Sequence, residues 1–103
     1  MNKRLEILTR LVASGAADSF ARYALALEYR KERQLEAAIE VFEQLKDIDA
    51  AYLPMYLMCG QILVELRRVD DARQWLQAGL ELAGKTGDTK ALGELRGELE
   101  QLG

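Results

Sequence analysis

Residues 53 to 66 read LPMYLMCGQILVEL, and only Gln61 and Glu65 in this stretch carry strongly polar side chains. A helix at the surface of a globular protein normally combines an apolar stripe with a polar face. This stretch has almost no polar face, which leaves three interpretations: a membrane span, a helix buried on every side, or a helix with one buried face and one face for a partner. A membrane span needs about 20 apolar residues, so the first interpretation is excluded.

The pattern of residue sizes around this stretch recurs at a distance of 34 residues. Small residues align with small ones, and large apolar residues align with large apolar ones. The aligned pairs are Ala26 and Gly60, Tyr29 and Leu63, Leu35 and Val69, Ala38 and Ala72, Phe42 and Leu76, and Ile48 and Leu82. The N-terminal segment aligns in part, with Ile7 on Val41, Leu8 on Phe42 and Leu11 on Leu45. A fixed period of this length indicates a repeat architecture, and the N-terminal segment predicts half a repeat.

Apolar residues within each repeat follow the spacing of helices. Leu35, Ala38, Ile39, Phe42 and Leu45 recur at intervals of three and four. The chain is also rich in Ala, Leu, Glu and Arg, which are good helix formers. We therefore predict an all-α chain of about six helices, at 2–13, 19–32, 35–48, 53–67, 70–83 and 88–101.

Local signals support several of these helix boundaries. Asp18 or Ser19 and then Asp88 can cap the helices that follow them, because their side chains accept hydrogen bonds from backbone N–H groups. Pro54 suits a first helical turn, where its missing N–H costs nothing. Residues 83–89, AGKTGDT, contain two glycines and predict a flexible linker.

The helix–turn–helix unit of 34 residues resembles the tetratricopeptide repeat. The residues that carry the resemblance are Leu25, Ala26, Tyr29, Ala38 and Phe42 in the first unit, and Tyr56, Gly60, Ala72 and Leu76 in the second. The resemblance implies a right-handed α-α superhelix of antiparallel helices. It also implies a single domain, 1–103, with a half-repeat at 1–18, repeats at 19–52 and 53–86, and a capping helix at 87–103. Arg33 and Arg67 depart from the family pattern, which often has glycine at this turn.

The small residues of the repeat have a physical role. Two antiparallel helices approach closely only where their side chains are short. We therefore expect Ala26 to face Ala38, and Gly60 to face Ala72.

The composition argues against most kinds of catalytic and metal-binding site. The chain has no histidine and a single cysteine, Cys59, so it lacks the commonest general base and the residues for a disulfide or a thiolate metal site. Glu36, Glu40, Glu43 and Asp47 form an acidic stripe that is best explained as a solvated helix face. The net charge of -3 disfavours binding to nucleic acid. We predict a cytoplasmic protein that is not an enzyme and needs no cofactor or metal.

The resemblance places a binding surface on the first helix of each repeat. The predicted contact residues are Phe20, Tyr23, Leu27, Arg30, Leu57, Gln61 and Val64. Most of these are apolar, which favours an amphipathic helix or an extended apolar peptide over a C-terminal carboxylate. The predicted function is therefore protein–protein interaction with a protein or peptide partner. Two alternatives stay open: the same face forms a homodimer, or the terminal helices fold over it.

Overall fold

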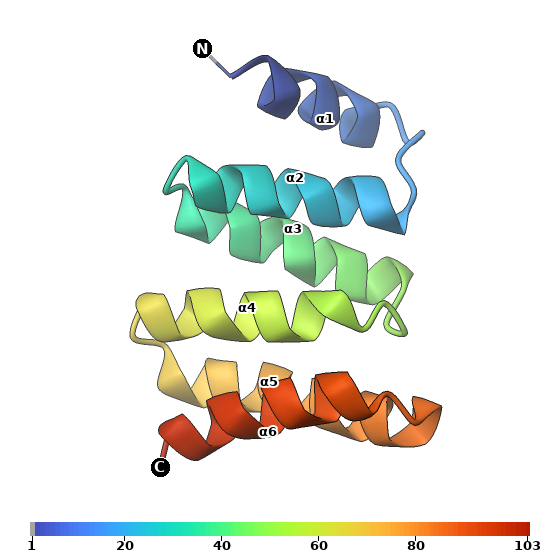
Figure 1. Cartoon of the computed structure of the whole chain (residues 1–103). Helices are drawn as coiled ribbons and strands as arrows, with labels where there is room; N and C mark the ends of the chain where they lie inside the picture. Colours follow the sequence, from blue (N-terminus) through green and yellow to red (C-terminus); the bar gives the residue numbers. More distant parts are fainter. Residues whose placement is uncertain (1) are drawn as a thin grey trace. The chain divides into compact units, whose positions relative to one another are not determined.

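The computed structural model describes residues 2–103, and these form six α-helices and no strand (Figure 1). The helices are α1 (Lys3–Ala13), α2 (Ser19–Lys31), α3 (Leu35–Ile48), α4 (Pro54–Glu65), α5 (Val69–Thr86) and α6 (Thr89–Gln101). The all-α prediction and the number of helices are confirmed. The prediction of a linker at 83–89 is wrong at its start, because α5 continues to Thr86. The chain leaves the helical conformation at Gly87, with φ of 75°, and at Asp88, which is extended.

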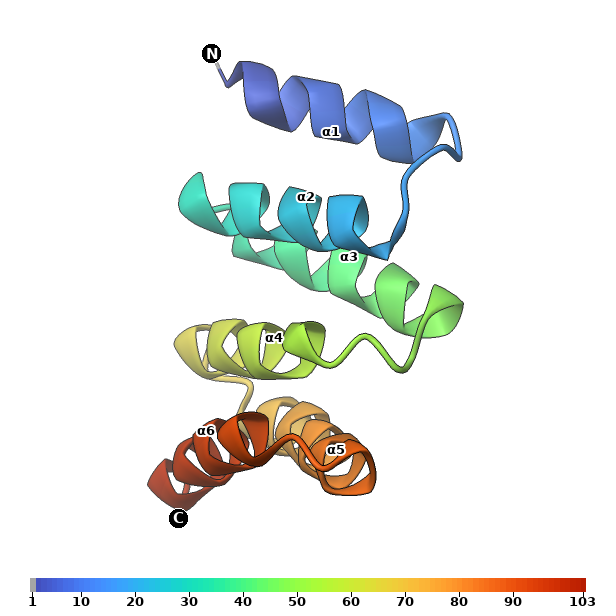
Figure 2. The same ribbon diagram turned by 45° about the vertical axis from the view of Figure 1, so that its right-hand side comes forward.

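The chain divides into two compact units, Met1–Ala50 and Ala51–Gly103. In the first unit α2 packs against α1 and α3, and in the second α5 packs against α4 and α6. Figure 2 shows α5 and α6 side by side in the second unit. The boundary after Ala50 lies close to the predicted start of the second repeat, and the assignment of 1–103 to a single domain stays a prediction.

The first unit is held together by apolar side chains between α2 and α3. Leu25, Ala26, Ala38, Ile39, Phe42 and Leu45 are all buried. The ring of Tyr23 lies 6.1 Å from that of Phe42, at an interplanar angle of 56°, which is a tilted arrangement that aromatic pairs favour. Ala26 and Ala38 have no exposed surface, as expected of small residues between closely packed helices.

The second unit depends on two glycines at close contacts. A Cβ atom at Gly60 would lie 2.5 Å from Leu76 Cδ2, and one at Gly79 would lie 2.5 Å from Tyr56 Cβ. Both glycines therefore allow α4 and α5 to approach more closely than any other residue would. The atoms nearest to Gly60 belong to Leu76, one turn after the expected Ala72.

Helix N-termini follow the local signals. Asp18 Oδ1 accepts a hydrogen bond from Ala21 N at 2.8 Å, and Asp88 Oδ1 accepts one from Ala91 N at 3.0 Å. Pro54 occupies the first turn of α4. The expected caps at Asp18 and Asp88 and the place of Pro54 are thus confirmed.

Helix α4 contains the stretch that is apolar nearly all round. Its buried residues are Met55, Tyr56, Cys59, Gly60, Ile62 and Leu63. The residues at its predicted partner-binding positions are half-buried. No helix within residues 2–103 is long and apolar enough to cross a membrane. The apolar character of α4 therefore reflects its burial.

Candidate partner-binding surface

The first helix of the first repeat carries four of the predicted contact residues on one face. Phe20, Tyr23, Leu27 and Arg30 are spaced three and four apart along α2. Phe20 stands out because 65% of its surface is exposed, whereas the other three residues are half-buried. An exposed phenylalanine on a regular helix is a candidate anchor for a partner.

Tyr23 contributes less to an open surface than the sequence suggested. Its ring packs against the buried ring of Phe42 in α3. This contact places part of Tyr23 in the core of the first unit, so only its remaining edge is available to a partner.

The second helix with predicted contact residues is α4, which carries Leu57, Gln61 and Val64 in a half-buried row. Gln61 Nε2 donates a hydrogen bond to Glu98 Oε1 of α6 at 2.8 Å. A partner that used this N–H would first have to displace Glu98. Helix α6 thus engages part of the predicted surface of α4, in keeping with the alternative that a terminal helix covers it.

A shallow, mostly apolar hollow lies beside Phe20 in the first unit. Its lining comes from two helices: Arg4, Ile7 and Leu8 of α1, and Phe20, Ala21 and Ala24 of α2. Ile7 is as exposed as Phe20, at 65%. Sequence reasoning missed the contribution of α1. The signal was present in the alignment of Ile7 and Leu8 with Val41 and Phe42, which are buried.

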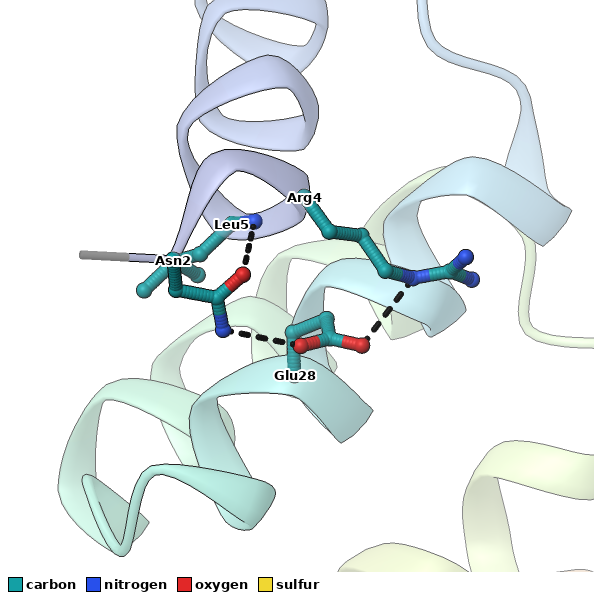
Figure 3. Close-up of polar contacts among 4 residues, drawn as sticks. All are labelled: Asn2, Arg4, Leu5 and Glu28. Atoms are coloured by element: carbon teal, nitrogen blue, oxygen red, sulfur yellow. Dashed lines mark hydrogen bonds and ion pairs between the residues drawn. The ribbon is translucent and has the colours of Figure 1, made fainter.

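Polar contacts hold α1 against α2. Asn2 Nδ2 donates to Glu28 Oε2 at 3.0 Å, and Arg4 Nε pairs with Glu28 Oε1 at 3.0 Å (Figure 3). Asn2 also caps α1, because its Oδ1 accepts from Leu5 N at 3.0 Å. The Glu28 side chain is only 12% exposed, so these contacts shield it from water. Two residues at the start of α1 thereby position the helix that forms one wall of the hollow.

The described residues show little that suggests catalysis. Among residues 2–103, no group of three His, Cys, Asp or Glu side chains could hold a metal ion. Cys59 is buried in α4, and the acidic stripe of Glu36, Glu40, Glu43 and Asp47 is exposed on α3. The hollow and the face of α2 next to it form the candidate site, and the lining of the hollow is mostly apolar.

The fold and this surface define a small helical-repeat protein. The tetratricopeptide repeat family matches residues 29–95, and the chain belongs to this family. No relative was found among curated proteins.

Solved structures of small repeat proteins are similar over most of the chain. The crystal structure of a tetratricopeptide repeat domain protein from Salinibacter ruber is 35% identical, with a TM-score of 0.78 over 84% of this chain and 96% of that one. A solution structure of a tetratricopeptide repeat domain protein from the same organism, also 35% identical, has a TM-score of 0.79 over 82% and 86%. A protein from Bordetella parapertussis is 27% identical, with a TM-score of 0.84 over 99% of this chain and 89% of that one.

Proposed function

We propose that this chain is a non-catalytic protein–protein interaction module that binds a helix or peptide of a partner. The observation that carries the proposal is the exposure of Phe20 beside an apolar hollow on the first helix of a tetratricopeptide repeat. Members of this family are generally protein-binding modules and typically lack catalytic activity.

The proposed contacts come from the two helices that carry the predicted residues. On α2, Phe20, Tyr23 and Leu27 supply apolar contacts, and Arg30 binds polar groups of the partner. On α4, Leu57 and Val64 supply further apolar contacts, next to Gln61. Apolar side chains on the exposed side of a helix are typical of surfaces that receive an amphipathic helix or an apolar peptide.

Affinity capture from native lysate tests this proposal. We expect the unmodified chain to retain a partner that both Phe20→Asp and Leu27→Asp lose, because a buried carboxylate without a partner is strongly disfavoured. Ile48→Asp is the matched control, since Ile48 is 59% exposed and lies on α3, outside the proposed contacts. Circular dichroism checks that all three variants keep their helices. Capture that survives Phe20→Asp and Leu27→Asp would show that α2 is not the binding helix.

A further inference from the structure

Helix α1 has the sequence pattern of a second repeat helix without the first helix that normally covers it. Ile7, Leu8 and Leu11 align at the 34-residue period with Val41, Phe42 and Leu45 of α3. The three residues of α3 are buried, with 8%, 0% and 0% of their surfaces exposed, and α3 packs against α2. In α1, by contrast, Ile7 is largely exposed, and Leu8 and Leu11 are half-buried. This face of α1 is therefore built to be covered by a helix, in the way that α2 covers α3.

The hollow lies where such a helix would pack. It is lined by Arg4, Ile7 and Leu8 of α1 and by residues of the first two turns of α2. A helix in this place would bury Ile7 and Phe20, the two most exposed large apolar side chains within residues 2–103. Burying such side chains favours docking, because it removes apolar surface from water.

We propose that the hollow between α1 and α2 receives an amphipathic helix of a partner protein, and that this helix carries an acidic residue next to Arg4. The inference rests on the proposed function and names the class of partner. The helix would occupy the place that α2 takes against α3.

Arg4 supplies the selectivity for an acidic residue. Its counterparts in the two complete helix pairs are Ala38 and Ala72, which have no exposed surface. The Arg4 side chain is 66% exposed, and it uses Nε for Glu28 while its two terminal nitrogens point away from that carboxylate (Figure 3). A guanidinium group presents paired donors that match a carboxylate. Lys3 and Arg10 add positive charge to α1, against the single acidic residue Glu6.

A second copy of this chain does not fit the hollow through its C-terminal helix. Its C-terminal helix α6 has the register of α2, since Asp18, Ala21, Leu25 and Glu28 align with Asp88, Ala91, Leu95 and Glu98. Both helices also start with the same aspartate cap. In this register Arg96 of α6 is equivalent to Ala26 of α2 and to Gly60 of α4. Ala26 is fully buried, and Gly60 lies against Leu76 of α5.

Docking of α6 on α1 would bring two arginines together. Leu8 of α1 is the counterpart of Leu76, so docking α6 on α1 would direct Arg96 towards Leu8 and its neighbour Arg4. Two like charges would then meet at the closest approach of the helices. The partner helix that fits has the apolar spacing of α6 and a carboxylate in place of Arg96.

A peptide of residues 87–103 carrying Arg96→Glu tests the inference against the full-length chain by fluorescence anisotropy. We expect it to bind at least about tenfold more tightly than the unmodified peptide, a difference of about 1.4 kcal/mol. A Lys90→Glu peptide is the matched control, because it changes the charge equally on the side of the helix away from Leu92, Leu95 and Leu99. The Lys90→Glu change lies near the N-terminus of the helix, where Glu favours helicity. A gain in affinity seen only with the Arg96→Glu peptide therefore does not arise from helix formation.

Variants of the full-length chain test whether the peptide binds in the hollow. Ile7→Asp should abolish binding of the Arg96→Glu peptide, and Ile48→Asp should leave it unchanged. Equal binding of the two charge-altered peptides, failure of the Arg96→Glu peptide to bind, or binding that survives Ile7→Asp would each overturn the inference. The proposed function would then still be decided separately, by the capture of a native partner with Phe20→Asp and Leu27→Asp.

Discussion

Arg33 and Arg67 occupy the same place in two successive helical hairpins, and both adopt the left-handed backbone conformation, with φ of 60° and 63°. Each follows the first helix of its hairpin and forms the same pair of terminal hydrogen bonds. Arg33 N donates to Arg30 O at 2.9 Å and the next N–H to Tyr29 O at 2.8 Å. Arg67 N donates to Val64 O at 3.0 Å, and Arg68 N donates to Leu63 O at 2.9 Å. This helix-ending motif usually has glycine at the left-handed position.

Replacing either arginine by glycine should stabilise the chain. A left-handed conformation costs a residue with a side chain roughly 1–2 kcal/mol, and glycine loses part of this gain through its greater freedom in the unfolded state. We expect Arg33→Gly and Arg67→Gly each to raise the free energy of unfolding by about 0.5–1 kcal/mol. Urea denaturation followed by circular dichroism measures the change. Arg67→Val should act in the opposite direction, and a stabilising valine would contradict the argument.

Gly79→Ala should destabilise the second unit. The added Cβ would lie 2.5 Å from Tyr56 Cβ and 3.1 Å from Leu95 Cδ2. The Tyr56 contact would force α4 and α5 apart, and the end of the Leu95 side chain would have to move. Overpacking of this kind costs about 1–3 kcal/mol. The midpoint of urea unfolding should fall accordingly. An unchanged midpoint would mean that α4 and α5 do not approach as closely as the structure shows.

Gly93→Ala should have the opposite effect and stabilise the chain. Gly93 lies inside α6 and is exposed, and no atom would lie within 4 Å of an added Cβ. Alanine is favoured over glycine in a helix by about 0.8–1 kcal/mol, so the free energy of unfolding should rise by about that amount. Thermal denaturation of the two glycine variants in parallel provides the comparison. Destabilisation by Gly93→Ala would indicate that this face of α6 is covered.

Glu28→Ala should loosen α1 without unfolding α3. The substitution removes the shared acceptor of Asn2 and Arg4, and a hydrogen bond of this kind contributes about 1 kcal/mol. Hydrogen–deuterium exchange should show several-fold faster exchange of the α1 amides. The α3 amides, in contrast, should keep their protection relative to the unmodified chain. Glu40→Ala, which removes an exposed carboxylate from α3, is the control, and equal effects of the two variants would exclude a specific role for Glu28.

The helices were predictable because their signals are local. Apolar spacing, the aspartates before α2 and α6 and the proline of α4 each act within a few residues, and the predicted boundaries lie close to the observed ones. The end of α5 was predicted too early, because Gly84 was assigned to a linker. In the structure Gly84 stays inside α5 on its exposed side, where an added Cβ would meet no atom within 4 Å. A glycine pair in the sequence does not reveal which of its members leaves the helix.

The candidate surface was predictable only on α2. The resemblance to the tetratricopeptide repeat placed Phe20 on the binding face of its helix, but the exposure of Ile7 depends on which helices lie next to α1. The two partners of Glu28 also come from the start of another helix, since Asn2 caps α1 and Arg4 lies in its first turn. Contacts of this kind are made between residues distant in the sequence, and no local pattern specifies them.

By itself, the sequence determined that the chain is a set of short amphipathic helices that pair at a 34-residue period, because backbone hydrogen bonding and side-chain burial repeat with the helical turn. Only the tertiary structure decided which apolar faces are covered. It buried most of α4 and joined Gln61 to Glu98, and it left Ile7 and Phe20 open to solvent. The physical reason is that burial is a property of neighbouring helices, and a neighbour is identified only once the helices have packed.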